Sequence, residues 1–382
     1  MQDLVPDAQA WRRHLHANPE LLYNVQRTAE FVAERLREFG CDEVRTGIGR
    51  TGVVGVIRGR KGARNRVIGL RADMDALPIE EMTNLPYRST VPGKMHACGH
   101  DGHTAMLLGA ARYLARARDF SGTAVVIFQP AEEGGAGAKA MIDDGLMETF
   151  AIDEVYAMHN WPKVPVGVFA LRKGPVLASA DFFTIRLEGK GGHAAYPHLC
   201  VDSIVAGAQI VTALQTIVSR NVEPLDSCVI SVARFSAGSA NNVLPQTAEL
   251  EGTTRTMSPA TRDLAERRIR EIVAGIAAAS GIGATVDYHR DYPPTVNHPA
   301  QTEFAASVAR QLVGSERVLT ELPPQMGAED FAFMLEARPG AFIMIGNGDS
   351  AGLHHPGYDF NDAALPYGMA YFAGVVETAL AP

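Results

Sequence analysis

The sequence has little of several features that would point to other kinds of protein. Only four of its 382 residues are cysteine, and they lie far apart, so no disulfide framework is indicated and reduced thiols are expected. No apolar run approaches the length of a membrane span, and the first residues lack the basic start and apolar run of a signal peptide. We therefore expect a protein of the cytoplasm that does not bind membranes.

An excess of positive charge is also missing. The net charge is -8 and the isoelectric point is near 5.9, without the clustered lysine and arginine that mark nucleic-acid binding. Nucleic acid is therefore not expected as a partner. Hydrophobic residues make up 46% of the chain, enough for a large core, and the length favours two domains or one domain that carries an insertion.

The stretch Met95–His103 holds the densest chemistry in the chain, with three histidines, a cysteine and an aspartate. Its two glycines make it too flexible for a helix interior, so we expect a loop that precedes a helix at 104–117. Cys98 and His100 are separated by one glycine, so a thiolate and an imidazole can turn toward one point and share a metal ion. The alternative is a polar loop whose histidines are solvated.

Polar residues also follow three predicted buried strands. The carboxyl ends of parallel strands meet at one edge of an α/β sheet, where such proteins place their ligands. In an adjacent pair of glutamates, one can bind a metal while the other handles protons, although a solvated turn is the commoner fate of such pairs. The strands are expected at 67–70, 123–128 and 155–158, and the residues that follow them are Asp73, Asp75, Glu132, Glu133 and His159.

The pattern changes near residue 178. Predicted elements there follow the order strand, helix, strand, strand, helix, strand, which is the βαββαβ plan of a ferredoxin-like unit. They are expected at 181–188, 202–219, 227–235, 248–256, 259–279 and 284–289. We predict an α/β protein in which residues 1–177 and 293–382 form a mainly parallel sheet flanked by helices, and residues 178–292 form an inserted domain.

Six segments, in chain order, together resemble the hippurate hydrolase branch of the aminoacylase and carboxypeptidase G metallohydrolases. They are 95–103, 129–135, 158–162, 191–195, 326–331 and 354–356. The resemblance implies a zinc-exopeptidase-like catalytic domain interrupted by a lid that also forms a homodimer, with a tetramer as a further possibility. It implies a two-metal amidohydrolase that cleaves N-acyl amino acids, such as hippurate or N-acetyl amino acids, to a carboxylic acid and a free amino acid.

The resemblance also implies roles for single residues. Its general base falls on Glu132, and its ligands for two divalent ions per subunit fall on Cys98, His100, Glu133, His159 and His354. His354 is preferred to His355 because the final ligand of the family stands two positions before a proline. Distant relatives carry histidine where this chain has Arg71, so Asp73 is expected to support the ligands from behind. The thiolate favours Zn²⁺, and Mn²⁺ also suits this branch.

Residues of the inserted domain are expected to contact the substrate. His193 would donate to the developing oxyanion, and the resemblance implies that its loop reaches the active site of the other subunit. Arg255, together with Asn241 or Asn242, would hold the substrate carboxylate, although Arg255 could also be a surface residue at a strand end.

Three other functions compete with this interpretation. A dipeptidase or aminopeptidase of the same fold needs an acidic group to meet the free amine of its substrate, and none is identified. A thiol hydrolase would use Cys98 as its nucleophile. A metal-bound binding protein without catalysis would have no use for a base at Glu132 beside the ligand Glu133.

Overall fold

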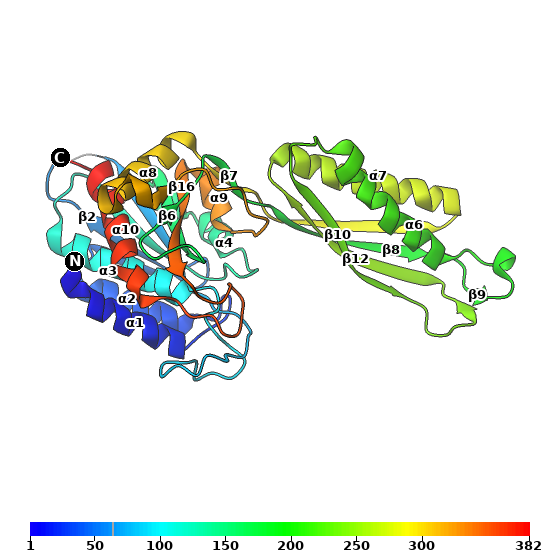
Figure 1. Cartoon of the computed structure of the whole chain (residues 1–382), viewed down its shortest axis with the longest axis horizontal. Coiled ribbons are helices and arrows are strands. Elements are labelled where there is room, and N and C mark those ends of the chain that lie inside the picture. The colour runs from blue at the N-terminus through cyan, green and yellow to red at the C-terminus, as the bar shows by residue number, and fades with distance from the viewer. Residues whose placement is uncertain (63–64) are drawn as a thin grey trace. The chain divides into compact units, whose positions relative to one another are not determined.

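The chain divides into two compact units in the computed structural model, which describes residues 1–62 and 65–382 (Figure 1). The first unit comprises Met1–Val176, Val296–Pro323 and Asp330–Pro382. The second comprises Leu177–Thr295 and the short segment Pro324–Glu329. No helix among the described residues is long and apolar enough to cross a membrane.

An eight-stranded sheet forms the centre of the first unit, in the order β1-β2-β4-β3-β5-β16-β6-β15. Its four middle strands, from β4 to β16, run parallel, whereas the pairs β1–β2, β2–β4 and β16–β6 are antiparallel. All seven residues of β3 are buried, as expected for a parallel strand covered on both faces. The strands are β1 (Glu43–Ile48), β2 (Gly52–Arg58), β3 (Val67–Asp73), β4 (Thr123–Gln129), β5 (Glu154–Pro162), β6 (Phe169–Ala170), β15 (Val318–Leu319) and β16 (Gly340–Gly348).

Helices flank this sheet. One hydrophobic core joins one face of the strands to α1, α2, α3, α8 and α10, while α4 and α9 pack on each other and on β4, β5 and β16. The helices are α1 (Val5–Ala17), α2 (Gln26–Glu38), α3 (His100–Ala117), α4 (Gly137–Asp143), α5 (Leu146–Thr149), α8 (Pro299–Val313), α9 (Phe331–Ala337) and α10 (Leu365–Ala379). The predicted mainly parallel sheet flanked by helices is confirmed.

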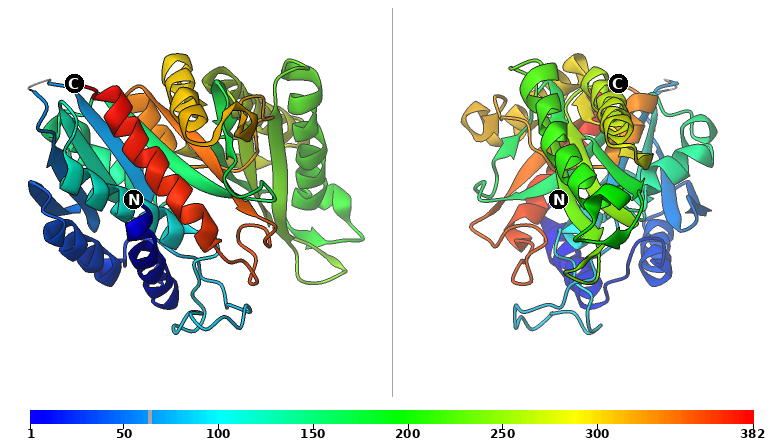
Figure 2. Two further views of the ribbon diagram at one scale, coloured as in Figure 1. Left: turned by 60° about the vertical axis from the view of Figure 1, so that its left-hand side comes forward. Right: turned by 90° about the vertical axis from the view of Figure 1, so that its right-hand side faces the viewer.

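The second unit is a four-stranded antiparallel sheet, in the order β10-β12-β8-β13, with two helices on one face (Figure 2). Alternate residues of β8 and β12 are buried against the helices, and the residues between them are more exposed and, apart from Phe182, polar, the pattern of a sheet solvated on one side. The elements are β8 (Ala180–Glu188), α6 (Ser203–Thr216), β10 (Cys228–Ala237), β12 (Thr247–Thr256), α7 (Pro259–Ser280) and β13 (Gly283–Tyr292).

Two small ribbons complete the fold. β9 (Gly192–His193) pairs with β11 (Val243–Leu244), and β7 (Gly174–Leu177) pairs with β14 (Thr295–Asn297). In the second unit, β9 follows the last residue of β8, Glu188, and β11 precedes the first residue of β12, Thr247. Glu188 and Thr247 are paired in the sheet. The β9–β11 ribbon therefore lies beyond one end of the four-stranded sheet.

Candidate active site

Ligand-type side chains of the first unit converge in several overlapping groups, three of which contain the predicted ligands, and each group has its ligand atoms within 4.8 Å of one another. Cys98 and His100 share one group with His159, and the Cys98 sulfur lies 3.3 Å from His159 Nε2. The other two groups join Cys98, Glu133 and His354, and His100, Glu132 and Glu133. Because the groups share members, they describe one continuous candidate site.

The helix that carries His100 begins earlier than the sequence indicated. α3 starts at His100, so the prediction that residues 100–103 belong to a loop was wrong. Gly99 precedes the helix at a φ of +88°, a conformation that favours glycine. Gly102 lies in the first turn of the helix, and Phe360 packs directly on it. A Cβ at this position would lie 2.3 Å from the Phe360 ring, so the contact requires a glycine. Both glycines serve close packing and do not loosen the helix.

Asp75 holds the two glutamates in place, a role that the sequence did not reveal. Its fully buried carboxylate accepts hydrogen bonds from the backbone N–H groups of Glu132, at 2.9 Å, and Glu133, at 3.1 Å. Its backbone carbonyl lies 2.7 Å from His100 Nδ1. A carbonyl can only accept, so Nδ1 carries a proton, and the neutral form of His100 directs the lone pair of Nε2 into the site.

Asp73 lies behind the site, between three cationic or imidazole groups. Its carboxylate is 2.7 Å from His103 Nδ1, 2.8 Å from Arg71 Nη1 and 3.7 Å from His100 Nε2. Burial alone would raise the pKa of Asp73, but His100, Arg71 and His103 hold this pKa well below its usual value. Arg71 also pairs with Asp330 at 3.0 Å. Nothing in the local sequence pairs Arg71 with Asp330, which is 259 residues away.

His354 and His355 point to different partners. His354 has a φ of +62°, and its Nε2 lies 3.4 Å from Glu133 Oε1. His355 Nδ1 instead accepts a hydrogen bond from the backbone N–H of Gly357 at 3.0 Å. The geometry therefore places His354, and not its neighbour, beside the other candidate ligands.

The electrostatics of the site favour a bound cation. Burial lowers the pKa of His100, but Asp73, Asp75 and Glu133 outweigh it and raise this pKa to about 10. Two buried ligand atoms, His100 Nε2 and Glu133 Oε1, have no hydrogen-bond partner among the described residues. Thiol, imidazole and carboxylate groups form a donor set suited to divalent metal ions, so the residues fit such ions.

The same surroundings argue against Cys98 as a free nucleophile. Burial raises the pKa of the Cys98 thiol well above its usual value, and the neighbouring Glu133, Glu132 and Asp73 raise it further. A reactive cysteine needs an electropositive, partly exposed environment that stabilises the thiolate. Cys98 is only 7% exposed and faces carboxylates, so these surroundings do not stabilise a free thiolate.

The candidate substrate-binding residues of the second unit lie at two separate positions. His193 is exposed on β9 and pairs with Val243 of β11, and the Asn242 carbonyl accepts from the Ala194 N–H at 3.0 Å. These contacts bring His193 close to the Asn241–Asn242 turn. Arg255 lies near the other end of β12, eight residues beyond Thr247, which is about 26 Å of extended strand.

Arg255 has the environment of a binding residue. Its Nη1 is buried without a hydrogen-bond partner in the part of the chain that the structure describes, and its guanidinium lies 5.8 Å from the centre of the Phe182 ring. Burial lowers its pKa, and neither Asp181 nor Asp291 offsets that effect. A buried guanidinium nitrogen without a partner is suited to bind an anion.

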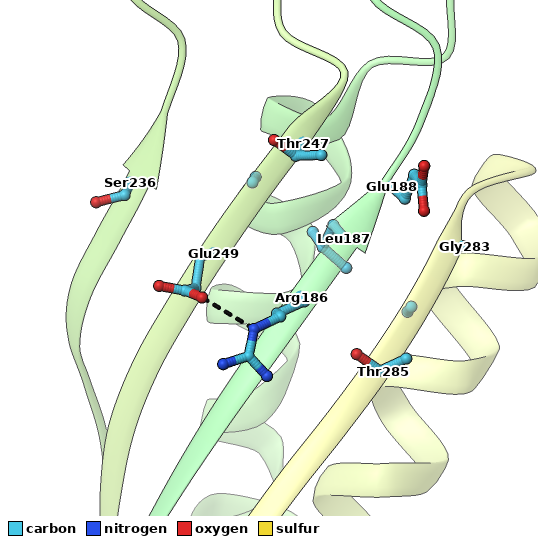
Figure 3. A pocket seen from close by; sticks show the side chains of 10 residues that line it. Arg186, Leu187, Glu188, Ser236, Thr247, Glu249, Gly283 and Thr285 are labelled. Atoms are coloured by element: carbon cyan, nitrogen blue, oxygen red, sulfur yellow. Dashed lines mark hydrogen bonds and ion pairs between the residues drawn. The ribbon is translucent and has the colours of Figure 1, made fainter.

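A large hollow lies on the polar face of the sheet in the second unit (Figure 3). Its volume is about 760 Å³, and its charged groups include Arg186 and Glu249, which already form an ion pair at 3.1 Å. None of the described residues that line it is a histidine or a cysteine. We therefore assign the chemistry to the convergent groups of the first unit.

The comparison with known proteins agrees with this geometry. Residues 69–378 match the model of peptidase family M20/M25/M40. The chain belongs to this family. The predicted resemblance and the prediction of an amidohydrolase are confirmed by M20 relatives named for that activity.

Three of these relatives are from bacteria. Hippurate hydrolase of Campylobacter jejuni subsp. jejuni is 44% identical over 371 residues, which cover 97% of this chain and 96% of that protein. Putative amidohydrolase YhaA of Bacillus subtilis is 42% identical over 374 residues, with 96% and 93% covered. N-acetyl-L-cysteine deacetylase of Bacillus subtilis is 42% identical over 355 residues, with 93% and 83% covered.

Two solved structures share the M20 fold. A putative aminohydrolase from methicillin resistant Staphylococcus aureus superposes with a TM-score of 0.93 at 35% identity and covers 99% of this chain and 97% of its own. The YXEP protein of Bacillus subtilis, described as a dinuclear metal binding peptidase of the M20 family, has a TM-score of 0.87 at 34% identity, with 100% and 99% covered. This M20 chain therefore has both the family fold and candidate ligands for divalent metal ions.

Proposed function

We propose that this enzyme hydrolyses the amide bond of N-acyl amino acids, such as hippurate or N-acetyl amino acids, and releases a carboxylic acid and a free amino acid. The observation that carries the proposal is the pair Glu132 and Glu133, fixed by Asp75 beside Cys98 and His100. The names of the relatives, hippurate hydrolase and N-acetyl-L-cysteine deacetylase, support the substrate class.

The proposed cofactor is a pair of divalent ions in each subunit. Five residues would hold them, with Asp73 supporting His100 and His103 from behind. The single thiolate favours Zn²⁺, and the carboxylate and imidazole ligands also suit Mn²⁺. The proposed ligands are Cys98, His100, Glu133, His159 and His354.

In this mechanism, bound metal ions supply an acidified water and polarise the amide carbonyl. Glu132 accepts a proton from the water and later passes it to the departing amine. Its 7% exposure keeps the carboxylate out of bulk solvent, and the hydrogen bond from its backbone N–H to Asp75 fixes the position of the Glu132 backbone. Arg255 and Asn241 or Asn242 would hold the carboxylate of the substrate.

We further propose a homodimer with shared sites. His193 would donate to the oxyanion in the active site of the partner subunit. The supporting observation is that His193 and Arg255 occupy opposite ends of the second unit. One copy of that unit is therefore poorly suited to bring both residues to a single substrate.

The proposed location is the cytoplasm. None of the four cysteines, all within the described residues, forms a disulfide, as expected for an enzyme in a reducing compartment.

The main alternative is a dipeptidase or aminopeptidase of the same fold. A direct comparison of substrates decides between the two. Metal-loaded enzyme is assayed with N-benzoyl and N-acetyl amino acids and, in parallel, with dipeptides that have a free amino terminus. We expect higher kcat/KM for the acylated substrates and loss of activity on exhaustive chelation. Preferred cleavage of the free dipeptides would overturn the proposal, and activity that survives chelation would favour the thiol mechanism.

A further inference from the structure

We propose that Asn160 is a positioning residue that sets the relative places of the three segments that carry Cys98, His159 and His354. The inference rests on the ligand set proposed above. These segments are the loop before α3, strand β5, and the loop between β16 and α10. They are far apart in the sequence, so noncovalent contacts must hold their ligand atoms in one geometry.

Asn160 is fully buried, directly after His159 in β5, and uses all of its polar groups. Its side-chain Nδ2 donates to the Cys98 carbonyl at 2.6 Å, and its Oδ1 accepts from the Tyr358 hydroxyl at 2.7 Å. Its backbone N–H donates to His103 Nε2 at 2.9 Å. Its backbone carbonyl accepts from His159 Nδ1 at 2.7 Å.

These contacts determine the orientation of the Asn160 side-chain amide and the tautomer of the His159 ring. The Cys98 carbonyl can only accept, so the side-chain NH₂ must face it and the side-chain oxygen must face the Tyr358 hydroxyl. The contact to the backbone carbonyl likewise requires the proton of His159 on Nδ1. The lone pair of Nε2 then faces the Cys98 sulfur at 3.3 Å, where a shared ion would lie.

Tyr358 extends the arrangement to the segment of His354. Tyr358 is fully buried four residues after His354, and the backbone N–H of His354 donates to the Ala97 carbonyl at 2.8 Å. The loop of His354 is therefore tied to the Cys98 loop by one direct contact and by one contact through Asn160.

Gly99 shows how closely these groups pack. A Cβ at this position would lie 2.3 Å from Asn160 Nδ2 and 2.5 Å from the Tyr358 hydroxyl oxygen. Any side chain there would displace the amide or the phenol. The glycine between the candidate ligands Cys98 and His100 is thus needed for the approach of Asn160 as well as for its positive φ.

Few other side chains could replace Asn160. Aspartate keeps the size and the acceptor for Tyr358, but it turns a carboxylate oxygen toward the Cys98 carbonyl. Leucine keeps the branched shape but is larger, and it leaves both the carbonyl and the hydroxyl unsatisfied in a buried place. Each change would shift the Cys98 and His354 segments while the ligands themselves remain present.

The test compares Asn160→Asp, Asn160→Leu and Tyr358→Phe with a matched control, Asn297→Asp. Asn297 is also buried, and its amide donates to the Phe342 carbonyl at 2.8 Å and accepts from the Phe342 N–H at 2.6 Å, without contact to a candidate ligand. Each variant is loaded with Co²⁺. Absorption then reports the thiolate-to-cobalt band and the coordination geometry, chelator competition gives the metal affinity, and thermal unfolding of the metal-free protein gives stability.

We expect the Asn160 variants to bind metal at least roughly tenfold more weakly and to show an altered cobalt spectrum, the scale of effect seen when the partner of a ligand is removed. Tyr358→Phe should show a smaller change of the same kind, and it serves as the test if the Asn160 variants do not fold. Asn297→Asp should lose stability but keep the wild-type spectrum and affinity.

Two outcomes would overturn the proposal: wild-type spectra and affinities in folded Asn160 and Tyr358 variants, or equal spectral changes in Asn297→Asp. The result is separate from the proposed activity. If wild-type enzyme fails to cleave N-acyl amino acids while the cobalt spectra change as expected, the positioning role stands and the substrate class is wrong.

Discussion

The carboxylate of Asp75 accepts a hydrogen bond from the backbone N–H of Glu132 at 2.9 Å, and its second oxygen engages the N–H of the following residue at 3.1 Å. Two consecutive amides thus converge on one buried anion. Ala131, just before them, has a φ of +54°, which turns the chain so that both N–H groups can face Asp75. This contact links the end of β3 to the loop after β4 and fixes the candidate base relative to the candidate ligands.

Asp75→Asn should therefore lower kcat at least about tenfold with a folded protein. The amide keeps the shape, but its NH₂ would face a backbone N–H in place of an acceptor, so one of the two contacts is lost and the glutamates shift. Steady-state kinetics on hippurate, with metal content determined in parallel, measure the effect. Asp144→Asn is the control, because Asp144 also accepts from a backbone amide, that of Gly49, away from the site. Equal losses in both variants would contradict the role of Asp75.

Glu132→Gln should abolish turnover and leave the metal content near that of wild type. The change removes a base while it preserves size and the backbone contact to Asp75. Elemental analysis and single-turnover kinetics measure the two effects separately. Loss of metal in this variant would mean that Glu132 is a ligand and that the roles of the two glutamates are exchanged.

Cys98→Ala should lower metal occupancy together with activity, because it removes one bond to the metal. The matched control is Cys228→Ala, a buried cysteine of the second unit that should keep full occupancy. Elemental analysis of both proteins, purified in the same way, measures occupancy. An inactive Cys98→Ala protein with full occupancy would remove Cys98 from the ligand set and revive the thiol mechanism.

His193→Ala should keep its metals and lose most of its activity. If His193 acts in the site of the partner subunit, mixing this variant with an equal amount of Glu132→Gln under subunit exchange should restore turnover. Random exchange makes about half of the dimers mixed, each with one complete site, so activity should approach about a quarter of wild type. No recovery after exchange has been confirmed by mass spectrometry would place His193 in the site of its own subunit.

His16 should make stability depend on pH. Burial lowers the pKa of His16, but hydrogen bonds to Asp101 at 2.8 Å and to Glu81 at 3.3 Å outweigh it and raise this pKa to about 9, from 6.5. A raised pKa means that the folded state holds the proton more tightly. The stabilisation is thus complete below about pH 6.5 and is lost as the pH rises through about 9. It amounts to on the order of 3 kcal/mol.

Denaturant unfolding of metal-free wild type and His16→Gln, at pH 6 and at pH 9.5, tests this expectation. The difference in the free energy of unfolding between the two proteins should be larger at pH 6. A difference that does not change with pH would mean that His16 is uncharged in the folded protein.

Much of the fold follows from local patterns in the sequence. The βαββαβ order of the second unit was predicted because each strand and helix shows its own period of apolar residues. The buried strands of the first unit were predicted because they are continuous apolar runs. The start of α3 was missed, since Gly99 and Gly102 are poor helix residues by propensity and are present for contacts with Asn160, Tyr358 and Phe360.

The sequence by itself determined which chemical groups are available: a thiol, histidines and paired carboxylates at strand ends and in one dense motif. Tertiary structure alone decided how they are held. Asp75 meets Glu132 across 57 residues, and Asn160 meets Tyr358 across 198. Such partners have no sequence signature, because a hydrogen bond depends on the separation of its atoms in space, and the packing of distant segments sets that separation.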